Sequence, residues 1–265
     1  MPYAPLRDLK IYYEVSGAEE AEPLLLLNGA FGLIDSASDW GKHFEVFARH
    51  YRLIAYEHRG HGRTDNPSQK FSGYSELADD AAGLLKYLGI KKVHVVGFSD
   101  GGITALKLAS LYPALVDTLV AIGVNYRNTP EILAAMYKLD GAYIEQNFKE
   151  WAAILERQYA HREPGYWKKL SAQMIAMWLD DSGYPTEAEM RAMKLPVLLM
   201  TGQRDPFGTV DQVLEMHRFI EGSELCILPG VAHAVPQQRP ELTGMVVLDF
   251  LERQRKKRLR ETYRP

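Results

Sequence analysis

The chain has 265 residues, of which 46% are hydrophobic and 25% charged, a composition typical of a globular protein large enough to bury a substantial core. Its net charge of −3 gives no reason to expect nucleic acid or an acidic membrane as a partner, and no apolar run approaches the roughly 20 residues that span a bilayer. The one cysteine, Cys226, cannot form an internal disulfide, and the N-terminus lacks the apolar stretch of a signal peptide. We therefore expect a cytoplasmic protein.

The first half of the chain alternates between predicted strands and predicted helices. Apolar runs typical of strands occupy residues 9–15, 24–27, 52–56, 93–96 and 116–122. Helical spacing covers residues 40–50, 74–88 and 103–109. Strands that alternate with helices predict a parallel sheet covered by helices on both faces.

This alternation stops between residues 125 and 194. The segment carries only helical signals and many large apolar side chains, among them Met136, Trp151, Trp167 and Trp178. We expect most of them to form the core of a helical insertion and the remainder to face a ligand, as a lid over a pocket requires. Strand signals at residues 197–200 and 225–228 and helical signals at 210–221 and 241–258 follow. The sequence thus predicts a core domain of residues 1–124 and 195–265 and a helical cap of residues 125–194.

A Gly-x-Ser-x-Gly pentapeptide, Gly97-Phe98-Ser99-Asp100-Gly101, lies between a predicted strand and a predicted helix. The two glycines leave room for the helix to pack close to the strand, which would hold Ser99 at the apex of a sharp turn with its hydroxyl exposed. A serine hydroxyl is a poor nucleophile unless a neighbouring base takes its proton. Ser99 is therefore a candidate nucleophile that needs a histidine nearby.

Among the eight histidines, His233 is the strongest candidate for this base. It follows the last predicted strand, in a loop where parallel sheets place ligand-contacting residues. His94 lies inside the strand that precedes Ser99 and cannot reach the end of that strand. His58 and His61 also follow a strand and stay open as candidates, although His61 belongs to a glycine turn that looks structural.

The imidazole in turn needs an acid to fix its tautomer and stabilise its charged form. Asp205 follows a predicted strand, whereas the competitor Asp117 lies at the start of its strand, at the opposite edge of the sheet. The predicted catalytic residues are therefore Ser99, Asp205 and His233, in that order along the chain.

This order of motifs, with a helical insertion after the sixth strand, resembles the α/β-hydrolase fold across nearly the whole chain. Residues 28–30 (Asn-Gly-Ala) stand where that family usually has His-Gly-x, residues 57–64 resemble its Asp-x-Arg-Gly-x-Gly-x-Ser turn, and residues 202–205 resemble its Gly-x-x-Asp acid loop. The resemblance implies a mostly parallel eight-stranded sheet and an oxyanion hole made by the backbone N–H groups of Ala30 and Asp100. Asn28 and Glu57 replace a histidine and an aspartate at positions that are usually structural.

The residue at the apex of the Gly-x-Ser-x-Gly turn also restricts the substrate class. Family members that cleave carbon–halogen bonds or epoxides carry aspartate at this position. Ser99 therefore excludes those reactions and is consistent with hydrolysis of an ester, thioester, lactone, amide or carbon–carbon bond. Residues 97–106 are similar to the valacyclovir hydrolase (biphenyl hydrolase-like) subgroup, in which the aspartate after the nucleophile pairs with the ammonium group of an amino-acid ester. Asp100 either has this role or only complements the helix dipole. Phe31, Phe98 and Trp178 are further predicted substrate contacts.

We predict a serine hydrolase that cleaves small carboxylic esters through an acyl-enzyme intermediate and favours esters with a positive charge near the carbonyl. The first alternative is carbon–carbon, enol-lactone or perhydrolase chemistry with the same catalytic residues. The second is a ligand receptor that keeps a vestigial triad. We expect no metal or organic cofactor, because the histidines show no ligand spacing such as His-Glu-x-x-His.

Overall fold

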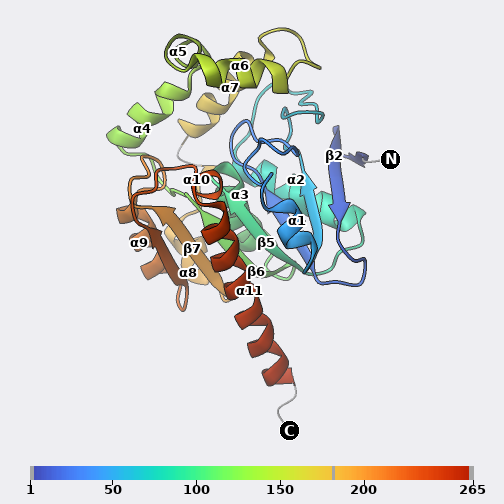
Figure 1. Ribbon diagram of the computed structural model, residues 1–265. Coiled ribbons are helices and arrows are strands. Elements are labelled where there is room, and N and C mark those ends of the chain that lie inside the picture. The colour runs from blue at the N-terminus through green and yellow to red at the C-terminus, as the bar shows by residue number, and fades with distance from the viewer. Residues whose placement is uncertain (1–2, 181–182, 263–265) are drawn as a thin grey trace.

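The computed structural model describes residues 3–180 and 183–262 and places eight strands of this part of the chain in one sheet (Figure 1). In chain order the strands are β1 (Tyr3–Leu6), β2 (Leu9–Ser16), β3 (Pro23–Leu27), β4 (Arg52–Tyr56), β5 (Val93–Phe98), β6 (Val116–Ile122), β7 (Val197–Gly202) and β8 (Glu224–Leu228). Their order across the sheet is β1-β2-β4-β3-β5-β6-β7-β8. The β1–β2 and β2–β4 pairs are antiparallel and the other pairs are parallel. The carboxyl ends of β3 to β8 therefore meet at one edge of the sheet.

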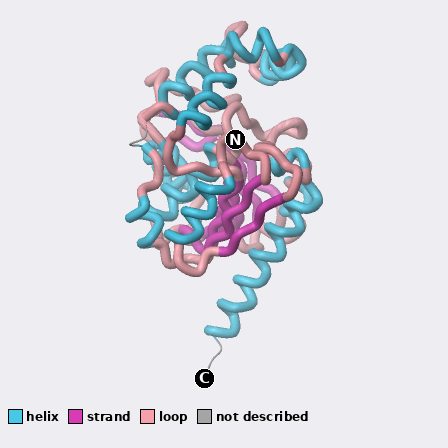
Figure 2. The backbone as a smooth tube through the Cα atoms, turned by 90° about the vertical axis from the view of Figure 1, so that its left-hand side faces the viewer, coloured by secondary structure: helices cyan, strands magenta, loops and turns pink. Residues whose placement is uncertain are grey.

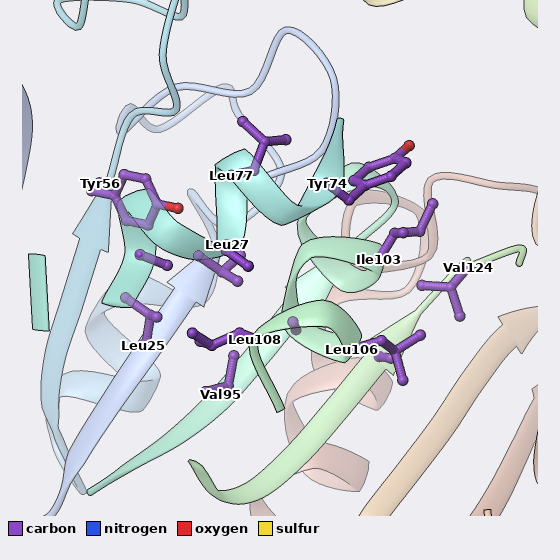
Figure 3. Close-up of a cluster of buried hydrophobic side chains, with 14 of the residues drawn as sticks. Leu25, Leu27, Tyr56, Tyr74, Leu77, Val95, Ile103, Leu106, Leu108 and Val124 are labelled. Atoms are coloured by element: carbon purple, nitrogen blue, oxygen red, sulfur yellow. The ribbon is translucent and has the colours of Figure 1, made fainter. Parts of the chain in front are cut away.

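The central strands are buried on both faces because helices cover the sheet on each side. The four leucines at residues 24–27 of β3 are all 0% exposed. Successive side chains of a strand point to opposite faces, so Leu25 and Leu27 belong to one hydrophobic cluster and Leu24 and Leu26 to the other. Figure 3 shows the first cluster, in which Leu25 and Leu27 lie with Leu106 and Leu108 of the helix after β5.

The helices are α1 (Phe44–Ala48), α2 (Tyr74–Tyr87), α3 (Asp100–Leu111), α4 (Pro130–Met136), a 3₁₀ turn η1 (Tyr137–Leu139), α5 (Gly141–Asn147), α6 (Lys149–Gln158), α7 (Tyr166–Trp178), α8 (Glu187–Ala192), α9 (Val210–Phe219), α10 (Val235–Gln238) and α11 (Pro240–Thr262). Side chains of α2 and α3 pack in the first cluster. Phe47 of α1 and Phe250 of α11 pack in the second.

Three elements differ from the sequence predictions. Strand β1 and the short helix α10 were not predicted. The helix predicted over residues 40–50 is shorter, because it begins only at Phe44. Trp40 lies before it in irregular backbone, where its indole N–H donates to the carbonyl of Leu27 at 3.0 Å. The Trp40 carbonyl accepts from the N–H groups of His43 at 2.7 Å and Phe44 at 3.2 Å, so Trp40 lies in the turn that leads into α1.

Helices α4 to α7 lie between β6 and β7 in the chain and form a separate layer above the carboxyl edge of the sheet (Figures 1 and 2). Trp167 and Met174 of this layer are buried, as expected for its own core. Helix α8, which falls inside the predicted cap, packs against α3 and α9. The division of the chain at residues 124 and 195 stays a prediction.

Helix α11 runs along the second face of the sheet and projects beyond the body of the protein (Figure 1). The run of basic residues at its end predicts a solvated helix end, and several of these side chains are partly exposed and also form ion pairs. Arg253 pairs with Glu224 at 2.7 Å, and Arg258 pairs with Glu22 and Asp117. No helix in the described part of the chain is both long and apolar enough to cross a membrane.

Candidate active site

The turn between β5 and α3 holds Ser99 in a backbone conformation that side chains rarely adopt, with φ of +52° and ψ of −124°. The close packing predicted for the flanking glycines is present. A Cβ added to Gly97 would lie 2.3 Å from the carbonyl oxygen of Gly101, and one added to Gly101 would lie 2.4 Å from that of Leu27. Both distances are too short for a Cβ atom, so the sharp turn requires glycine at both positions. A larger residue at either position would disrupt the turn.

The three residues expected to act together lie in one chain of hydrogen bonds. The Ser99 hydroxyl lies 2.9 Å from Nε2 of His233, and Nδ1 of His233 lies 2.9 Å from both carboxylate oxygens of Asp205. They come from the turn after β5, the loop after β7 and the loop after β8, all at the carboxyl edge of the sheet. The geometry therefore suits proton transfer from the serine to a histidine that the aspartate orients.

Asp205 is itself fixed by backbone groups. One of its carboxylate oxygens accepts hydrogen bonds from the N–H groups of Phe207 at 2.8 Å and Gly208 at 3.0 Å. Burial favours the neutral acid, but His233 and these donors outweigh burial and lower the pKa of Asp205. Asp205 is thus a carboxylate at neutral pH.

The pKa of His233 is shifted in the opposite direction. Burial disfavours the imidazolium, but the charge and hydrogen bond of Asp205, with smaller contributions from Asp39 and Asp100, raise the pKa above its usual 6.5. The rings of Phe98 and Phe207 lie with their centroids 4.9 and 4.7 Å from that of His233. The imidazole therefore has a fixed position and an environment that stabilises its charged form.

The other candidates from the sequence lie elsewhere. His94 contacts Thr118 within the sheet. His58 and His61 are buried, and burial, the largest cause in each, lowers their pKa to about 3 and about 4. Asp117 pairs with Lys92 at 2.7 Å near the amino end of β6. None of these side chains joins the hydrogen-bond chain at Ser99.

The loop of residues 28–32, called the oxyanion loop below, contains the predicted oxyanion motif at residues 28–30 and lies against this turn. A Cβ added to Gly29 would be 3.0 Å from Cβ of Ser99, and Ala30 and Phe31 line the same cavity as the serine. Phe31 has a φ of +61°. Asp100 is the first residue of α3, so its backbone N–H is among those at a helix N-terminus that have no partner within the helix. These positions suit two N–H donors beside the serine, as the resemblance implies.

The two departures from the family pattern behave differently. Glu57 is buried and accepts hydrogen bonds from the backbone N–H groups of Arg63 at 2.6 Å and Ile34 at 3.2 Å, so it ties two loops together. The Asn28 side-chain amide is also buried but has no hydrogen-bond partner among the described residues. Asn28 therefore does not hold the oxyanion loop through its side chain.

The cavity above Ser99 has a volume of about 680 Å³ and is mostly apolar. All four predicted substrate contacts, Phe31, Phe98, Asp100 and Trp178, line it. The cavity is also lined by residues of the predicted cap, among them Met136, Leu139, Trp151, Ile154, Leu155 and Gln158. The expectation that a few cap side chains face a pocket fits Met136, Trp151 and Trp178.

Asp100 is 8% exposed and receives hydrogen bonds from two neutral donors. The Tyr74 hydroxyl donates at 2.7 Å, and the Trp178 indole N–H lies 2.9 and 3.1 Å from the two carboxylate oxygens. Burial raises the pKa of Asp100 to about 6, against the opposing effect of these donors and of His233. Trp178 belongs to α7 in the predicted cap and Tyr74 belongs to α2, so Asp100 links these two helices.

The site residues predicted from the sequence include neither Asp39 nor Tyr74, although both line the cavity. Asp39 lies in an irregular loop and is buried, and Tyr74 is the first residue of α2. A buried acid in an irregular loop leaves no periodic signal in the sequence. In the described part of the chain, no cluster of three or more His, Cys, Asp or Glu side chains could hold a metal ion.

Comparison with known proteins assigns the family. The alpha/beta hydrolase family matches residues 24–243. This chain belongs to that family, and it is a hydrolase. The putative carbamate hydrolase RutD of Pantoea ananatis is 35% identical over 266 residues, covering 92% of this chain and 94% of the relative. The serine hydrolase BPHL of Homo sapiens is 26% identical over 255 residues, covering 92% and 84%.

A solved structure shares the fold. A carboxylesterase structure from Nitrososphaera gargenis superposes with a TM-score of 0.80 and 23% identity, covering 97% of this chain and 100% of that one. The prediction of an α/β-hydrolase fold with a mostly parallel eight-stranded sheet is thus confirmed.

Proposed function

We propose that this hydrolase cleaves small carboxylic esters through an acyl-enzyme intermediate on Ser99. The observation that carries the proposal is the continuous hydrogen-bond chain from Ser99 through His233 to Asp205, at a strained turn that opens into an apolar cavity. His233 takes the proton of Ser99 as the oxygen attacks the acyl carbon, and Asp205 stabilises the imidazolium that forms. The backbone N–H groups of Ala30 and Asp100 stabilise the negative charge on the carbonyl oxygen.

The second half of the reaction reverses these steps. The imidazolium of His233 protonates the departing alcohol, and the neutral imidazole then activates a water molecule that attacks the acyl-enzyme. The acid leaves and the proton returns to Ser99. Each step needs only the side chains and backbone groups named here.

A fluorophosphonate probe and p-nitrophenyl acetate and butyrate test this proposal. We expect the probe to label Ser99, identified by mass spectrometry of the labelled peptide, and both esters to be turned over. The Ser99→Ala variant is the control and should lose labelling and turnover together. Labelling without ester turnover would contradict ester hydrolysis and favour another acyl donor or a receptor role.

A second candidate is carbamate hydrolysis, favoured by the 35% identity with the putative carbamate hydrolase RutD of Pantoea ananatis. A carbamate carbonyl can be attacked by the same serine and stabilised by the same N–H donors. Carbamates therefore belong in the same substrate panel, and a kcat/KM for a carbamate above that for its matched ester would favour this candidate.

The position of Asp100 supports a preference for esters with a cationic group. Its carboxylate lines the cavity, and its donors, Tyr74 and Trp178, are both neutral. A carboxylate can accept about four hydrogen bonds, and these donors make three contacts, two to Oδ1 and one to Oδ2. One acceptor position on Oδ2 is therefore open to an ammonium group. No cationic side chain among residues 3–180 and 183–262 forms an ion pair with Asp100. The simpler alternative is that Asp100 only fastens α7 to the core.

The variant Asp100→Asn distinguishes these roles. We expect kcat/KM for an amino-acid ester to fall about 10–100-fold, because a hydrogen-bonded charge pair in a buried site contributes about 1.5–3 kcal/mol. The deamino analogue of that ester should change much less. As a matched comparison, Trp178→Phe removes a donor to Asp100. At a pH well above the Asp100 pKa of about 6 the carboxylate stays charged, so this variant should affect both esters to the same extent. Equal losses for both esters in Asp100→Asn would leave only the fastening role.

The pH dependence follows from the environment of His233. Its imidazole must be neutral to act as a base, and its pKa is raised above 6.5, so kcat/KM falls as the pH decreases through that raised value. With p-nitrophenyl butyrate, a neutral ester, we expect the acid limb of kcat/KM to have its midpoint above 6.5 after subtraction of spontaneous hydrolysis. A midpoint clearly below 6.5 would mean that another group is the base.

A further inference from the structure

Three consecutive residues before α1 hold the predicted oxyanion loop through their side chains. The Ser38 hydroxyl accepts from the N–H of Leu33 at 2.8 Å, and the Asp39 carboxylate accepts from the N–H of Gly29 at 2.8 Å. The Trp40 indole donates to the carbonyl of Leu27 at 3.0 Å. All three bonds are buried, and together they span the loop from the end of β3 to its far side.

Within this group, Asp39 holds the residue that precedes a proposed oxyanion donor. Gly29 directly precedes Ala30, whose N–H is a proposed oxyanion donor, so the bond to Asp39 orients the peptide unit next to it. A Cβ added to Gly32 would lie 2.7 Å from Oδ2 of Asp39, which shows how tightly the loop wraps this carboxylate. Since the Asn28 amide makes no hydrogen bond among the described residues, it offers the loop no comparable anchor.

Asp39 also faces the cavity and the histidine loop. It lines the same cavity as Ser99 and His233, and its Oδ1 atom accepts from the side-chain amide of Gln237 at 3.3 Å. Gln237 lies on α10, four residues after His233. One carboxylate therefore connects the oxyanion loop with the segment that carries the proposed base.

We propose that Asp39 is a positioning residue for the hydrolytic reaction: it fixes the oxyanion loop through Gly29 and contributes negative charge that stabilises the protonated form of His233. This inference rests on the proposed function, in which His233 becomes positively charged while the oxyanion forms. The two roles are compatible, because a carboxylate that accepts a hydrogen bond from the Gly29 N–H stays negatively charged and can still attract the imidazolium of His233.

The charged groups around both residues set the expected direction of the pH effect. His233 is faced by Asp205 from the loop after β7, Asp100 from α3 and Asp39 from the loop before α1. Asp39 is faced by His233, Asp100 and Asp35, and the exposed Lys42 lines the same cavity. Burial raises the pKa of Asp39 to about 6, so its carboxylate is charged above that pH. Removal of this charge should lower the pKa of His233.

The test compares Asp39→Asn, Asp39→Leu and Asp35→Asn with wild type. Asparagine keeps an oxygen that can accept the Gly29 N–H but loses the charge, whereas leucine loses both. Asp35→Asn is the matched control, because it removes a carboxylate from the same loop that contacts the N–H of Ala37 and the amide of Gln158 instead of Gly29. Circular dichroism and thermal unfolding verify that each variant is folded.

Two readouts follow that need no knowledge of the natural substrate. The first is the pKa of His233 from an NMR titration, with the resonance assigned by its loss in His233→Ala. The second is the rate of fluorophosphonate labelling at a pH where His233 is neutral in every variant. Turnover of p-nitrophenyl butyrate supplies kcat and KM as a third.

We expect Asp39→Asn to lower the pKa of His233 and to reduce the labelling rate and kcat about 10-fold, with KM nearly unchanged. Asp39→Leu should reduce them about 100-fold, because displacement of a catalytic group by about 1 Å has effects of that size. Asp35→Asn should match wild type. The proposal is overturned if Asp39→Asn matches Asp35→Asn in both His233 pKa and labelling, or if it raises KM at constant kcat, which would make Asp39 a substrate contact. Failure of ester hydrolysis itself would appear separately, as ester turnover absent from wild type or retained in Ser99→Ala.

Discussion

Replacement of Ser99 by alanine is expected to lower kcat/KM for p-nitrophenyl butyrate about 10⁵–10⁶-fold, the scale of loss found when a triad nucleophile is removed. Without the hydroxyl no acyl-enzyme forms, and His233 has no proton to accept at the site of attack. The remaining N–H donors and the cavity still bind the ester, so residual catalysis should be small but above the uncatalysed rate.

The matched control for this variant is Ser110→Ala, the same chemical change on the same helix α3, outside the cavity above Ser99. Its kcat/KM should equal that of wild type. Because the substitution at Ser99 only shortens the side chain, the melting temperature of Ser99→Ala should stay within a few degrees of wild type. A kcat/KM in Ser99→Ala close to that of wild type would mean that the nucleophile is another residue.

The second large effect is expected for Asp205→Asn, with a fall in kcat of about 10⁴-fold. The asparagine can keep the bonds from Phe207 and Gly208, so the loop should retain its shape. Its amide can donate to Nδ1 of His233, however, which places the imidazole proton on Nε2, the atom that faces Ser99. In that tautomer His233 cannot accept the serine proton, and the positive charge that forms later also loses its partner.

Asp117→Asn provides the comparison, since Asp117 is the competing acid in the sequence and lies near the amino end of β6. The substitution removes the same charge, but the Asp117 carboxylate pairs with Lys92 and Arg258 rather than with His233. We expect some loss of thermal stability and a kcat close to wild type. If instead Asp117→Asn lost activity as severely as Asp205→Asn, the assignment of the acid by strand position would be wrong.

The tertiary structure agrees with the sequence wherever the signal is local or depends on strand order. The Gly-x-Ser-x-Gly turn is largely local, because the steric limit at Gly97 arises from the backbone of Gly101 in the same motif. The limit at Gly101 is not local, since it arises from the backbone of Leu27 and Asn28 at the end of β3. Asp205 and His233 were selected because both follow predicted strands, and parallel strands place their carboxyl ends at one edge. The hydrogen-bond distances join these same residues to Ser99.

The sequence by itself therefore determined the α/β class, the alternation of strands and helices, and the candidate residues at Ser99, Asp205 and His233. Only the tertiary structure decided that Asp39 holds Gly29 and that Tyr74 and Trp178 hold Asp100. These contacts join irregular loops and helices up to 78 residues apart, and no periodic pattern encodes them. The shape and charge of the cavity depend on such contacts, because a pocket is defined by which side chains from distant segments meet above the nucleophile.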